Sequence, residues 1–534
     1  MKQLFLTIVF TSLLLSVYAQ EQPRVRRQAD EHFMRYEYGN AALLYEDLIK
    51  HRSKVDPEVI TRLAYCYRKM NAYEKAAQWY AKATADATHA KAEDWLYYGD
   101  ALKSLGRYEE AVAQYNKYAQ QPGADQARVK DRIAGCDSAK IWLASPDTDF
   151  VLRNAAPANT SYADWGGIFY KTSYALFTSD SLRRDELSGK SKRYRRSYGW
   201  TMQDYARLYL GREDKYGRIT IRDLSPRLNK FKYHIGPLAY TADYDTVYFT
   251  ITNPDRPHGK KMKGWPVYGT RRLMVFYSVN KNGAWQKPVP FAYNRPDSFS
   301  VGHVALSADG SVLYFASDMP GGYGETDIWY CEKQPDSTWG TPKNCGPVIN
   351  TPEQDEFPTV SGGNVFYYAS KGHAGMGGFD IFEASGARDQ WSAPVNLHVP
   401  RNSPADDFFY TVIHNEKGFL SSNREGGKGD DDIYFLSFNP EPLRTPIKPL
   451  LTIKLEGSTC PNFLGCCVYL YNKQRGIGWC YLLEDGHFEA MLEADTEYEI
   501  RVYVNGTLRQ TIPVDTHGVQ DATTIEKLIC PGQQ

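Results

Sequence analysis

A repeated all-β unit in the second half of the chain constrains its fold more than any other feature of the sequence. The motif Trp-x-x-Pro recurs at Trp285, Trp339 and Trp391, at spacings of 54 and 52 residues. Each unit also contains an aromatic strand, a glycine-rich turn and a further strand that begins with Asp-Ile. The aspartates of these Asp-Ile strands are Asp327, Asp380 and Asp432. A unit of about four short strands cannot bury its own face, so the copies must pack radially around a channel.

The number of units gives the size of the ring. Weaker copies of the aromatic strand occur at residues 174–177 and 247–249, which brings the visible units to five. The sequence therefore predicts an all-β propeller over residues 148–440. A sixth blade assembled from both ends of this segment is an alternative, because ring closure often pairs the first and last strands.

One complete unit shows what this repeat resembles. It runs from Asn350-Thr-Pro through Asp355-Glu-Phe-Pro, an aromatic strand, Gly-Gly-x-Gly and Asp-Ile-aromatic to Trp391-x-x-Pro. This order is similar to the PD40 form of WD40-like repeats. The resemblance implies a cell-envelope protein of a Bacteroidetes-type bacterium.

The glycine-rich turns suggest two kinds of site. A phosphate-binding loop is excluded, because these glycines join two strands rather than a strand to a helix, and no Gly-Lys-Ser/Thr follows them. We expect Asp327, Asp380 and Asp432 to cap backbone amides of the turns rather than to bind calcium. The run from Asp430 to Asp432 is the one cluster that could hold a cation.

Familiar catalytic motifs are missing from the chain. It has neither a Gly-x-Ser-x-Gly nucleophile elbow nor a His-Glu-x-x-His zinc motif. The stretch from Ser307 to Gly310 breaks the sialidase box and indicates a hairpin turn. We therefore expect a protein that is not an enzyme, with no catalytic residues, no metal site and no cofactor. A propeller hydrolase is the alternative.

Residues 28–143 contain a second repeat, which is helical. Segments that begin at Tyr38, Tyr73 and Tyr108 superpose at a period of 35 residues, each with alanine at its fourth position. They resemble three tetratricopeptide repeats in an all-α solenoid. Residues 125–143 would form the capping helix that such an array requires. We expect a partner to bind in the groove lined by the first helix of each pair, around Tyr65, Arg68, Lys69 and Asp100.

Two expanded turns in the first two blades concentrate positive charge in a chain whose net charge is zero. Residues 181–200 hold seven Lys or Arg against two acids, and residues 251–272 hold six against one, so each turn carries +5. We expect this basic rim to bind an anionic partner, such as an acidic protein, an anionic lipid or a wall polymer. The alternative is two solvated loops. The rim consists of Arg183, Arg184, Lys190, Lys192, Arg193, Arg195, Arg196, Lys260, Lys261 and Lys263.

Residues 1–19 have the pattern of a cleaved secretory signal peptide. Lys2 precedes an apolar run from Leu4 to Val17, and the small-x-small spacing of a cleavage site ends at Ala19. The run is shorter than the roughly 20 residues of a membrane span, and no later stretch is apolar enough to span. We expect an exported protein without a transmembrane span, which argues against nucleic acid as a partner.

Residues 451–534 follow a proline-rich linker at 441–450 and indicate a small β-sandwich. Alternating apolar residues at 451–455, 467–471 and 498–504 predict a half-buried antiparallel sheet. The motif from Asp485 to Phe488 resembles the carboxypeptidase regulatory-like, transthyretin-type fold.

Nine cysteines accompany this predicted export, and five of them lie in the last 75 residues. These five are Cys460, Cys466, Cys467, Cys480 and Cys530. One or two disulfides are expected to supplement the thin core of the final domain, with the pairing left open. Cys331 and Cys345 are candidates for a bridge within one blade, whereas Cys66 and Cys136 are expected to be buried thiols.

In this order, the domains resemble the PorE-like envelope proteins associated with type IX secretion. Those proteins continue into an OmpA-type peptidoglycan-binding domain, whereas this sequence stops at Gln534, which puts direct wall anchoring in doubt. The resemblance implies a non-catalytic periplasmic scaffold, associated with the outer membrane or cell wall, whose partners are other envelope or secretion-system proteins. The alternative is a surface-exposed secreted binding protein whose last domain is a secretion signal.

Overall fold

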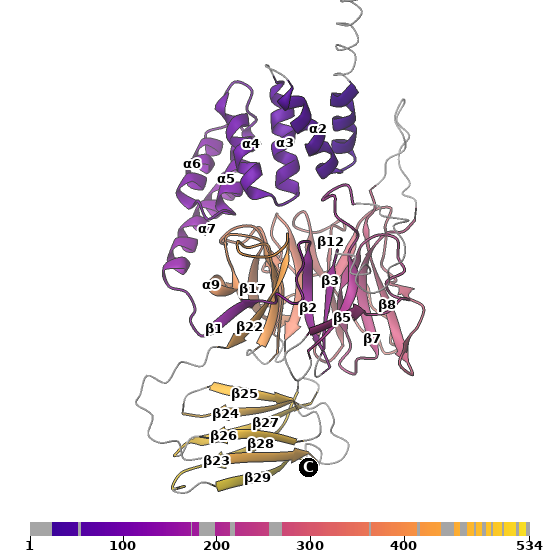
Figure 1. Cartoon of the computed structure of the whole chain (residues 1–534), viewed down its shortest axis with the longest axis vertical. Coiled ribbons are helices and arrows are strands. Elements are labelled where there is room, and N and C mark those ends of the chain that lie inside the picture. Colours follow the sequence, from indigo (N-terminus) through magenta and orange to yellow (C-terminus); the bar gives the residue numbers. More distant parts are fainter. Residues whose placement is uncertain are drawn as a thin grey trace, which may run out of the picture.

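The computed structural model describes residues 24–51, 55–171, 174–180, 198–213, 219–255, 270–361, 365–413, 417–438, 453–459, 467–474, 477–482, 487–492, 495–504, 507–519 and 523–529. Helices form one layer, a ring of β-sheets forms the next, and two further sheets of the C-terminal region lie on the far side of the ring (Figure 1). Within the described ranges, no helix is both long enough and apolar enough to cross a membrane.

Three helices of the helical layer begin at the tyrosines of the predicted repeat. Helices α2, α4 and α6 begin at Tyr38, Tyr73 and Tyr108, and the alanine three positions after each tyrosine is completely buried. Asp56 and Asp125 cap the helices that follow them, accepting hydrogen bonds from backbone N–H groups. A helix over residues 24–34 precedes α2. The others are α2 (Tyr38–Lys50), α3 (Pro57–Lys69), α4 (Tyr73–Ala85), α5 (Ala92–Lys103), α6 (Tyr108–Ala119) and α7 (Gln126–Ala144).

Five antiparallel sheets follow the helices and form a closed ring, so the predicted propeller is confirmed with five blades among the described residues. The inner strand of each blade is β2 (Asp164–Tyr170), β6 (Ile235–Tyr240), β11 (Val301–Leu306), β15 (Asp355–Ser361) or β20 (Asp407–Ile413). The second strands are β3 (Tyr174–Ser179), β7 (Thr246–Thr252), β12 (Val312–Ser317), β16 (Val365–Ser370) and β21 (Lys417–Ser422). The third strands are β4 (Arg207–Glu213), β8 (Leu273–Lys281), β13 (Asp327–Glu332), β17 (Asp380–Ala387) and β22 (Asp432–Phe438).

The outermost strands complete the blades and close the ring. Strand β1, which precedes the first blade in sequence, pairs with β22 of the last blade from Phe150 opposite Phe438 to Asn154 opposite Tyr434. The two ends of the segment therefore complete the fifth blade and do not make a sixth. The remaining short elements are β1 (Phe150–Asn154), β5 (Ile219–Asp223), β9 (Ala284–Trp285), β10 (Val289–Pro290), β14 (Lys343–Asn344), β18 (Gln390–Trp391), β19 (Val395–Asn396) and α9 (His398–Arg401).

An asparagine before each inner strand fastens neighbouring blades together, a feature that the sequence analysis missed. In each case the backbone N–H of a third-strand residue donates to Oδ1, and Nδ2 donates back to the carbonyl of that same residue, at 2.7–2.9 Å. The pairs are Asn159 with Ile433, Asn229 with Leu208, Asn294 with Val275, Asn350 with Ile328 and Asn402 with Ile381. The first pair joins the two ends of the ring.

The repeated aspartates act as the sequence predicts. Asp327 accepts from the N–H groups of Tyr323 and Gly324 at 2.6 and 3.0 Å, and Asp380 accepts from those of Met376 and Gly377 at 2.8 and 3.1 Å. Asp432 caps the corresponding turn of the last blade. These carboxylates stabilise the glycine-rich turns by satisfying buried amides.

The candidate bridge between Cys331 and Cys345 is not formed, since both are free, buried thiols. Cys331 packs with Leu313 and Phe315 toward the second blade, whereas Cys345 packs with Ile328 and residues of the fourth blade. The two sulfurs therefore belong to hydrophobic cores on opposite sides of one sheet. Cys66 and Cys136 are also free and buried, as expected.

The C-terminal region contains two sheets around a small apolar core. One sheet has the order β26 (His487–Leu492), β23 (Ile453–Thr459) and β29 (Thr523–Ile529), with β23 and β29 parallel. The other has the order β25 (Ile477–Leu482), β24 (Cys467–Asn472), β27 (Glu497–Val504) and β28 (Thr507–Asp515). Val468, Leu470 and Ile500 are in the core between them. Cys460, Cys466 and Cys530 lie outside the described residues, as do the predicted signal peptide at 1–19 and the linker at 441–450.

Candidate functional site

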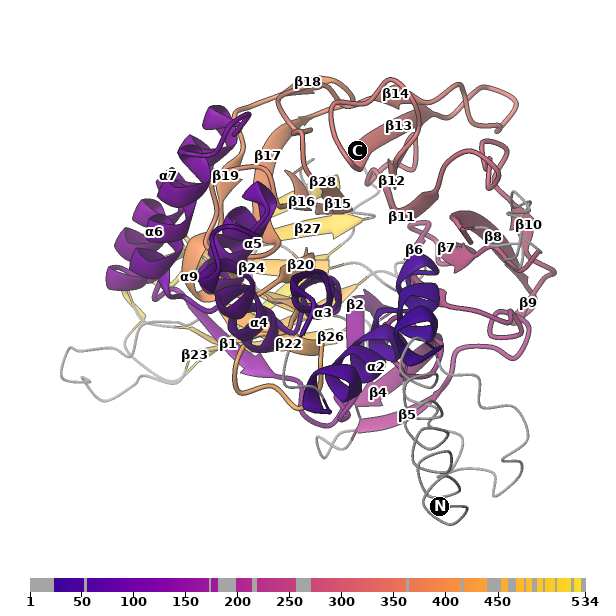
Figure 2. The same ribbon diagram turned by 90° about the horizontal axis from the view of Figure 1, so that it is seen from above.

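The helices lie over the face of the propeller that carries the glycine-rich turns. They arch over the fourth, fifth and first blades and leave β11 to β14 uncovered (Figure 2). Met376, in the glycine-rich turn before β17, is completely buried within the hydrophobic core of the helices. A Cβ on Gly135 of α7 would come within 2.6 Å of the carbonyl oxygen of Gly375. The helical layer and the propeller therefore share one continuous packed core.

Charged side chains also connect the helices to the propeller at this boundary, which we call the joint. The guanidinium of Arg132 on α7 donates to Asp100 at 2.9 Å, to Glu353 of the propeller at 3.2 Å and to the carbonyl oxygen of Lys371 at 3.0 Å. Arg128 lies 2.6 Å from the same Glu353 carboxylate. Nearby, the Tyr73 hydroxyl donates to Asp406 of the propeller. Because Arg132 is 9% exposed and Glu353 is 16% exposed, little solvent screens their ion pair.

The four predicted groove residues contact either charged residues of the joint or aromatic rings of the helices. Asp100 accepts from Tyr115 at 2.9 Å and from Arg132. The Arg68 guanidinium lies 3.7 Å from the centre of the Tyr97 ring, and it also lies over Tyr65. Burial, together with Arg68, lowers the pKa of Lys69 to about 8. The structure thus gives these side chains internal contacts, and their partner-binding role stays a prediction.

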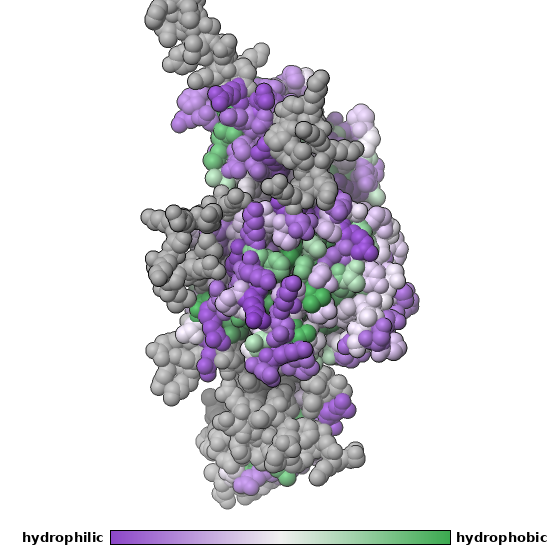
Figure 3. Space-filling view, turned by 90° about the vertical axis from the view of Figure 1, so that its right-hand side faces the viewer, coloured by the Kyte–Doolittle hydropathy of each residue, from purple (hydrophilic) through white to green (hydrophobic). Residues whose placement is uncertain are grey.

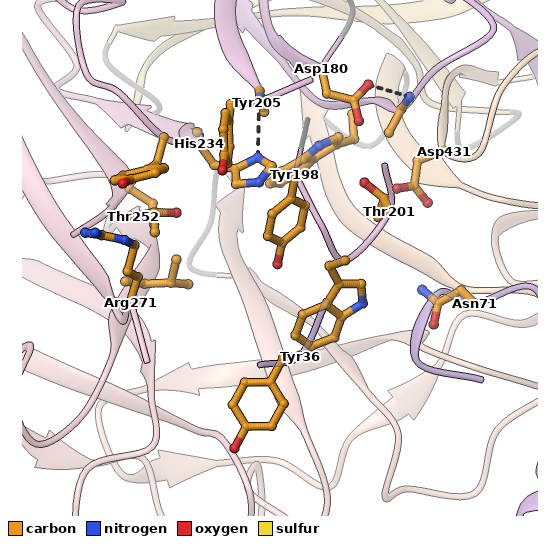
Figure 4. Close-up of a pocket in the computed structure, with 18 of the residues that line it drawn as sticks. Tyr36, Asn71, Asp180, Tyr198, Thr201, Tyr205, His234, Thr252, Arg271 and Asp431 are labelled. Atoms are coloured by element: carbon orange, nitrogen blue, oxygen red, sulfur yellow. Dashed lines mark hydrogen bonds between the residues drawn. The ribbon is translucent and has the colours of Figure 1, made fainter. Parts of the chain in front are cut away.

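A cavity of about 1280 Å³ lies where the first helices meet the mouth of the propeller channel. Its walls come from the turn before α2, from segment 198–206 and from the inner strands of the ring, and they are rich in aromatic rings (Figure 4). The aromatic lining residues are Tyr36, Trp165, Tyr198, Trp200, Tyr205, Tyr233, Phe357, Phe379 and Phe408. Sequence analysis did not identify this cavity, because its walls come from segments far apart in the chain.

Five β-bulges shape the floor of the cavity and the channel below it. Each inner strand has a register shift beside a residue with positive φ. Those residues are Gly166 at +71°, Gly236 at +118°, His303 at +52°, Phe357 at +56° and Phe409 at +48°. A bulge redirects side chains, and a non-glycine residue in this region is held there at a cost in strain. The rings of His303 and Phe357 stack at the cavity, with 4.2 Å between their centres.

His234 is a neutral hydrogen-bond donor in the cavity wall. The backbone N–H of Ala206 donates to its Nδ1 at 3.1 Å, so the proton of the neutral ring is on Nε2. Burial, with Arg207 nearby, lowers the pKa of His234 to about 3. Nε2 is buried and has no hydrogen-bond partner in the described part of the chain. The ring is held edge to face by Tyr198 and Tyr205, at 4.4 and 4.9 Å between centres.

Three aspartates form the acidic side of the cavity. Asp180 is 6% exposed and accepts from the N–H of Ala163 at 2.8 Å, and burial next to Asp164 and Asp431 raises its pKa to about 8. Burial next to Asp406 and Asp430 raises the pKa of Asp431 to about 7. Asp406 accepts from the N–H of Phe379 at 2.8 Å and lies 3.5 Å from Lys371. Carboxyl groups therefore outnumber cations on this side, and the raised pKa values keep Asp180 and part of the Asp431 population protonated near pH 7.

The described acids of the cavity are not arranged as a set of metal ligands. Across the described ranges, no group of three or more His, Cys, Asp or Glu side chains is arranged to hold a metal ion. In the run from Asp430 to Asp432, Asp430 accepts from Gln203 and Asp432 caps its turn, so two of the three are already engaged.

The predicted basic rim, at residues 183–196 and 260–263, lies entirely outside the described residues. Arg271, at the end of the second expanded turn, lines the cavity and lies over the Tyr233 ring at 4.3 Å. On the side of the molecule that includes the second blade, hydrophobic side chains form small groups among hydrophilic ones (Figure 3).

No protein-family model and no curated protein matches the chain. Among solved structures, it is similar to an α-L-arabinofuranosidase from Lactobacillus brevis at 13% identity, covering 53% of this chain and 91% of that one, with a TM-score of 0.33. It is also similar to an arabinanase from Bacillus subtilis, at 11% identity, 53% and 95% coverage and a TM-score of 0.32. Prolyl oligopeptidase B from Galerina marginata matches at 14% identity, over 67% of this chain and 42% of that one, with a TM-score of 0.28. Similarity at this level says nothing about activity.

Proposed function

We propose that this protein is an exported, non-catalytic scaffold of the cell envelope that holds a partner at the joint between its helices and its propeller. The periplasmic, PorE-like role implied by the order of its domains belongs to this proposal. The observation that carries it is the shared core at the joint, where Met376 of the propeller is buried among the helices and Arg132 ties them to Glu353. A rigid two-part body with a large cavity at its joint is suited to presenting a fixed binding surface.

The chemistry of the cavity also favours binding over catalysis. Asp180 accepts a backbone hydrogen bond, and Asp406 accepts from a backbone amide, from Tyr73 and from Asn423. A general acid or base must be free to exchange a proton with a substrate, and these two carboxylates are held by the protein's own donors. Among the described lining residues, the other carboxyls are Asp431 and Glu37. Glu37 contacts His32, whereas Asp431 has no such partner and is therefore included in the test of catalysis below.

Two measurements test this proposal. The tagged full chain is cross-linked in the envelope fraction of its own cells and purified, and we expect a defined envelope protein to co-purify in stoichiometric amounts. In parallel, the purified chain is incubated with envelope glycans and peptides, and we expect no turnover. Turnover that disappears in the variants Asp180→Asn or Asp431→Asn would overturn the non-catalytic scaffold, as would failure to capture any partner.

A further inference from the structure

The cavity combines three features that point to one ligand chemistry. We propose that it binds an extended peptide segment through a lysine or arginine side chain of that segment. This inference rests on the proposed function, since it names the partner chemistry of the same site. The three features come from different side chains: the acids, the ring pair of Tyr198 and Trp200, and His234, whose ring Tyr198 contacts.

The first feature is an uncompensated carboxylate. Asp431 lines the cavity, and its carboxyl is influenced by burial and by other carboxylates, with no hydrogen-bond donor or cation paired with it among the described residues. Asp180 is close enough to interact with it electrostatically, and Lys371 is the cation found close to the neighbouring Asp406. Arg271, on the other wall, donates to the carbonyl oxygen of Asn253 at 3.0 Å instead. A cation entering between Asp180 and Asp431 would favour the ionised forms of both carboxyls, whereas an anion would disfavour them.

The second feature is a pair of aromatic rings, those of Tyr198 and Trp200, which also line the cavity. The rings of Tyr198 and Trp200 are nearly parallel, with 6.3 Å between their centres. Trp200 is fixed from behind, because its Nε1 donates to the carbonyl oxygen of Lys69 at 2.7 Å and Tyr38 packs edge-on against it at 4.7 Å. Aromatic faces attract ammonium and guanidinium groups, and a fixed ring loses little entropy when it binds one.

The third feature is the buried Nε2–H of His234, which has no acceptor among the described residues. A buried donor without an acceptor is costly, so such a group marks a place where a ligand acceptor belongs. The backbone carbonyl of a bound peptide supplies that acceptor. The volume of about 1280 Å³ exceeds the roughly 300–1,000 Å³ of a small-molecule pocket, which favours several residues of extended chain over a free amine.

The test uses the full chain and two labelled peptides, acetyl-Gly-Gly-Lys-Gly-Gly-amide and its norleucine counterpart, with binding followed by fluorescence anisotropy. We expect the lysine peptide to bind at least 10-fold more tightly than the norleucine peptide. Asp431→Asn should remove this preference, and Thr201→Arg, which places a cation in the cavity, should remove it as well. The matched control is Asp137→Asn, on the exposed surface of α7, which should keep the preference.

Thermal unfolding of each variant establishes that it is folded. Equal binding of the two peptides, no binding of either, or an undiminished preference in both cavity variants would overturn the inference. The scaffold proposal is tested separately. If the Asp431→Asn variant still captures the envelope partner, the lysine site is contradicted and the scaffold is not. If the lysine peptide binds selectively but no partner is captured, the scaffold is contradicted and the lysine site is not.

Discussion

Arg132 and Glu353 form an ion pair across the boundary between the helices and the propeller, with 3.2 Å between the guanidinium and the carboxylate. They are 221 residues apart in sequence. The same guanidinium also binds Asp100 of α5, so a single side chain links two helices to the propeller. The helical layer is therefore fastened to the propeller, and residues of both line the cavity.

Replacing Arg132 should loosen this joint. We expect Arg132→Met to lower the free energy of unfolding by about 3 kcal/mol, at the low end for a broken buried pair because Arg128 remains beside Glu353. The control is Arg107→Met, which removes an exposed pair with Glu110 and should cost well under about 1 kcal/mol. Urea unfolding measures both. Equal losses in the two variants would show that the joint contributes no special stability.

The asparagine between blades is a separate source of stability. Asn350→Ala removes two hydrogen bonds and leaves the N–H and carbonyl of buried Ile328 without partners, so we expect a loss of roughly 2–3 kcal/mol. Asn116→Ala, on the exposed face of α6, should be neutral or slightly stabilising. The two variants are compared by their midpoints of thermal unfolding. A neutral Asn350→Ala would mean that water replaces the lost bonds.

Stability should fall as the pH rises from 6.5 to 8. The folded-state pKa values of Asp180 and Asp431, about 8 and 7, lie above the unfolded value of about 3.9. The folded form therefore holds protons that the unfolded chain has released, so the stabilisation is complete below about pH 4, falls progressively as the pH rises, and is lost once the pH has passed the folded pKa values of about 7 and 8. His234 titrates below this window, with a folded pKa of about 3.

A neutral replacement at Asp180 tests this assignment. Asp180→Asn should reduce the pH dependence by on the order of 1–2 kcal/mol, whereas Asp336→Asn, at an exposed turn, should leave it unchanged. Scanning calorimetry at both pH values provides the comparison. If Asp180→Asn shows the same slope as the unmodified chain, the buried carboxyl is not its source.

Cys331 and Cys345 should remain thiols even under oxidising conditions. They occupy different hydrophobic cores, and burial raises the pKa of Cys331 to about 12, which leaves little reactive thiolate. We expect both to be alkylated only after denaturation, and no peptide joining them in a non-reducing digest. Detection of that peptide by mass spectrometry would contradict the placement of the two side chains.

Local features of the sequence predicted local structure well. The repeat tyrosines mark the first residues of α2, α4 and α6, and Asp327, Asp380 and Asp432 cap their turns, because both depend on contacts within a few residues. The ring could also be predicted, since each unit is too small to fold alone. The asparagines that join the blades could have been found from the sequence. Three of them lie five residues before an aspartate that begins an inner strand, namely Asn159, Asn350 and Asn402.

The site could not be predicted in the same way. The cavity needs Tyr36 from the helices, Tyr198 and His234 from the first two blades and Phe408 from the last blade, and no periodicity relates these positions. The predicted groove would be open only in a helical array that stands free of the propeller. Docking onto the propeller, which depends on long-range pairs such as Arg132 with Glu353, gives Asp100 an internal partner instead.

The most direct test of the scaffold places a photo-cross-linking amino acid at Tyr36, on the rim of the cavity, or at Tyr323, on the uncovered third blade. Both side chains are 51% exposed, so they differ in position and not in access. Irradiation of intact cells should join the envelope partner to the chain from position 36 and not from position 323. Cross-links to that partner only from position 323, or from neither position, would contradict a binding site at the joint of helices and propeller.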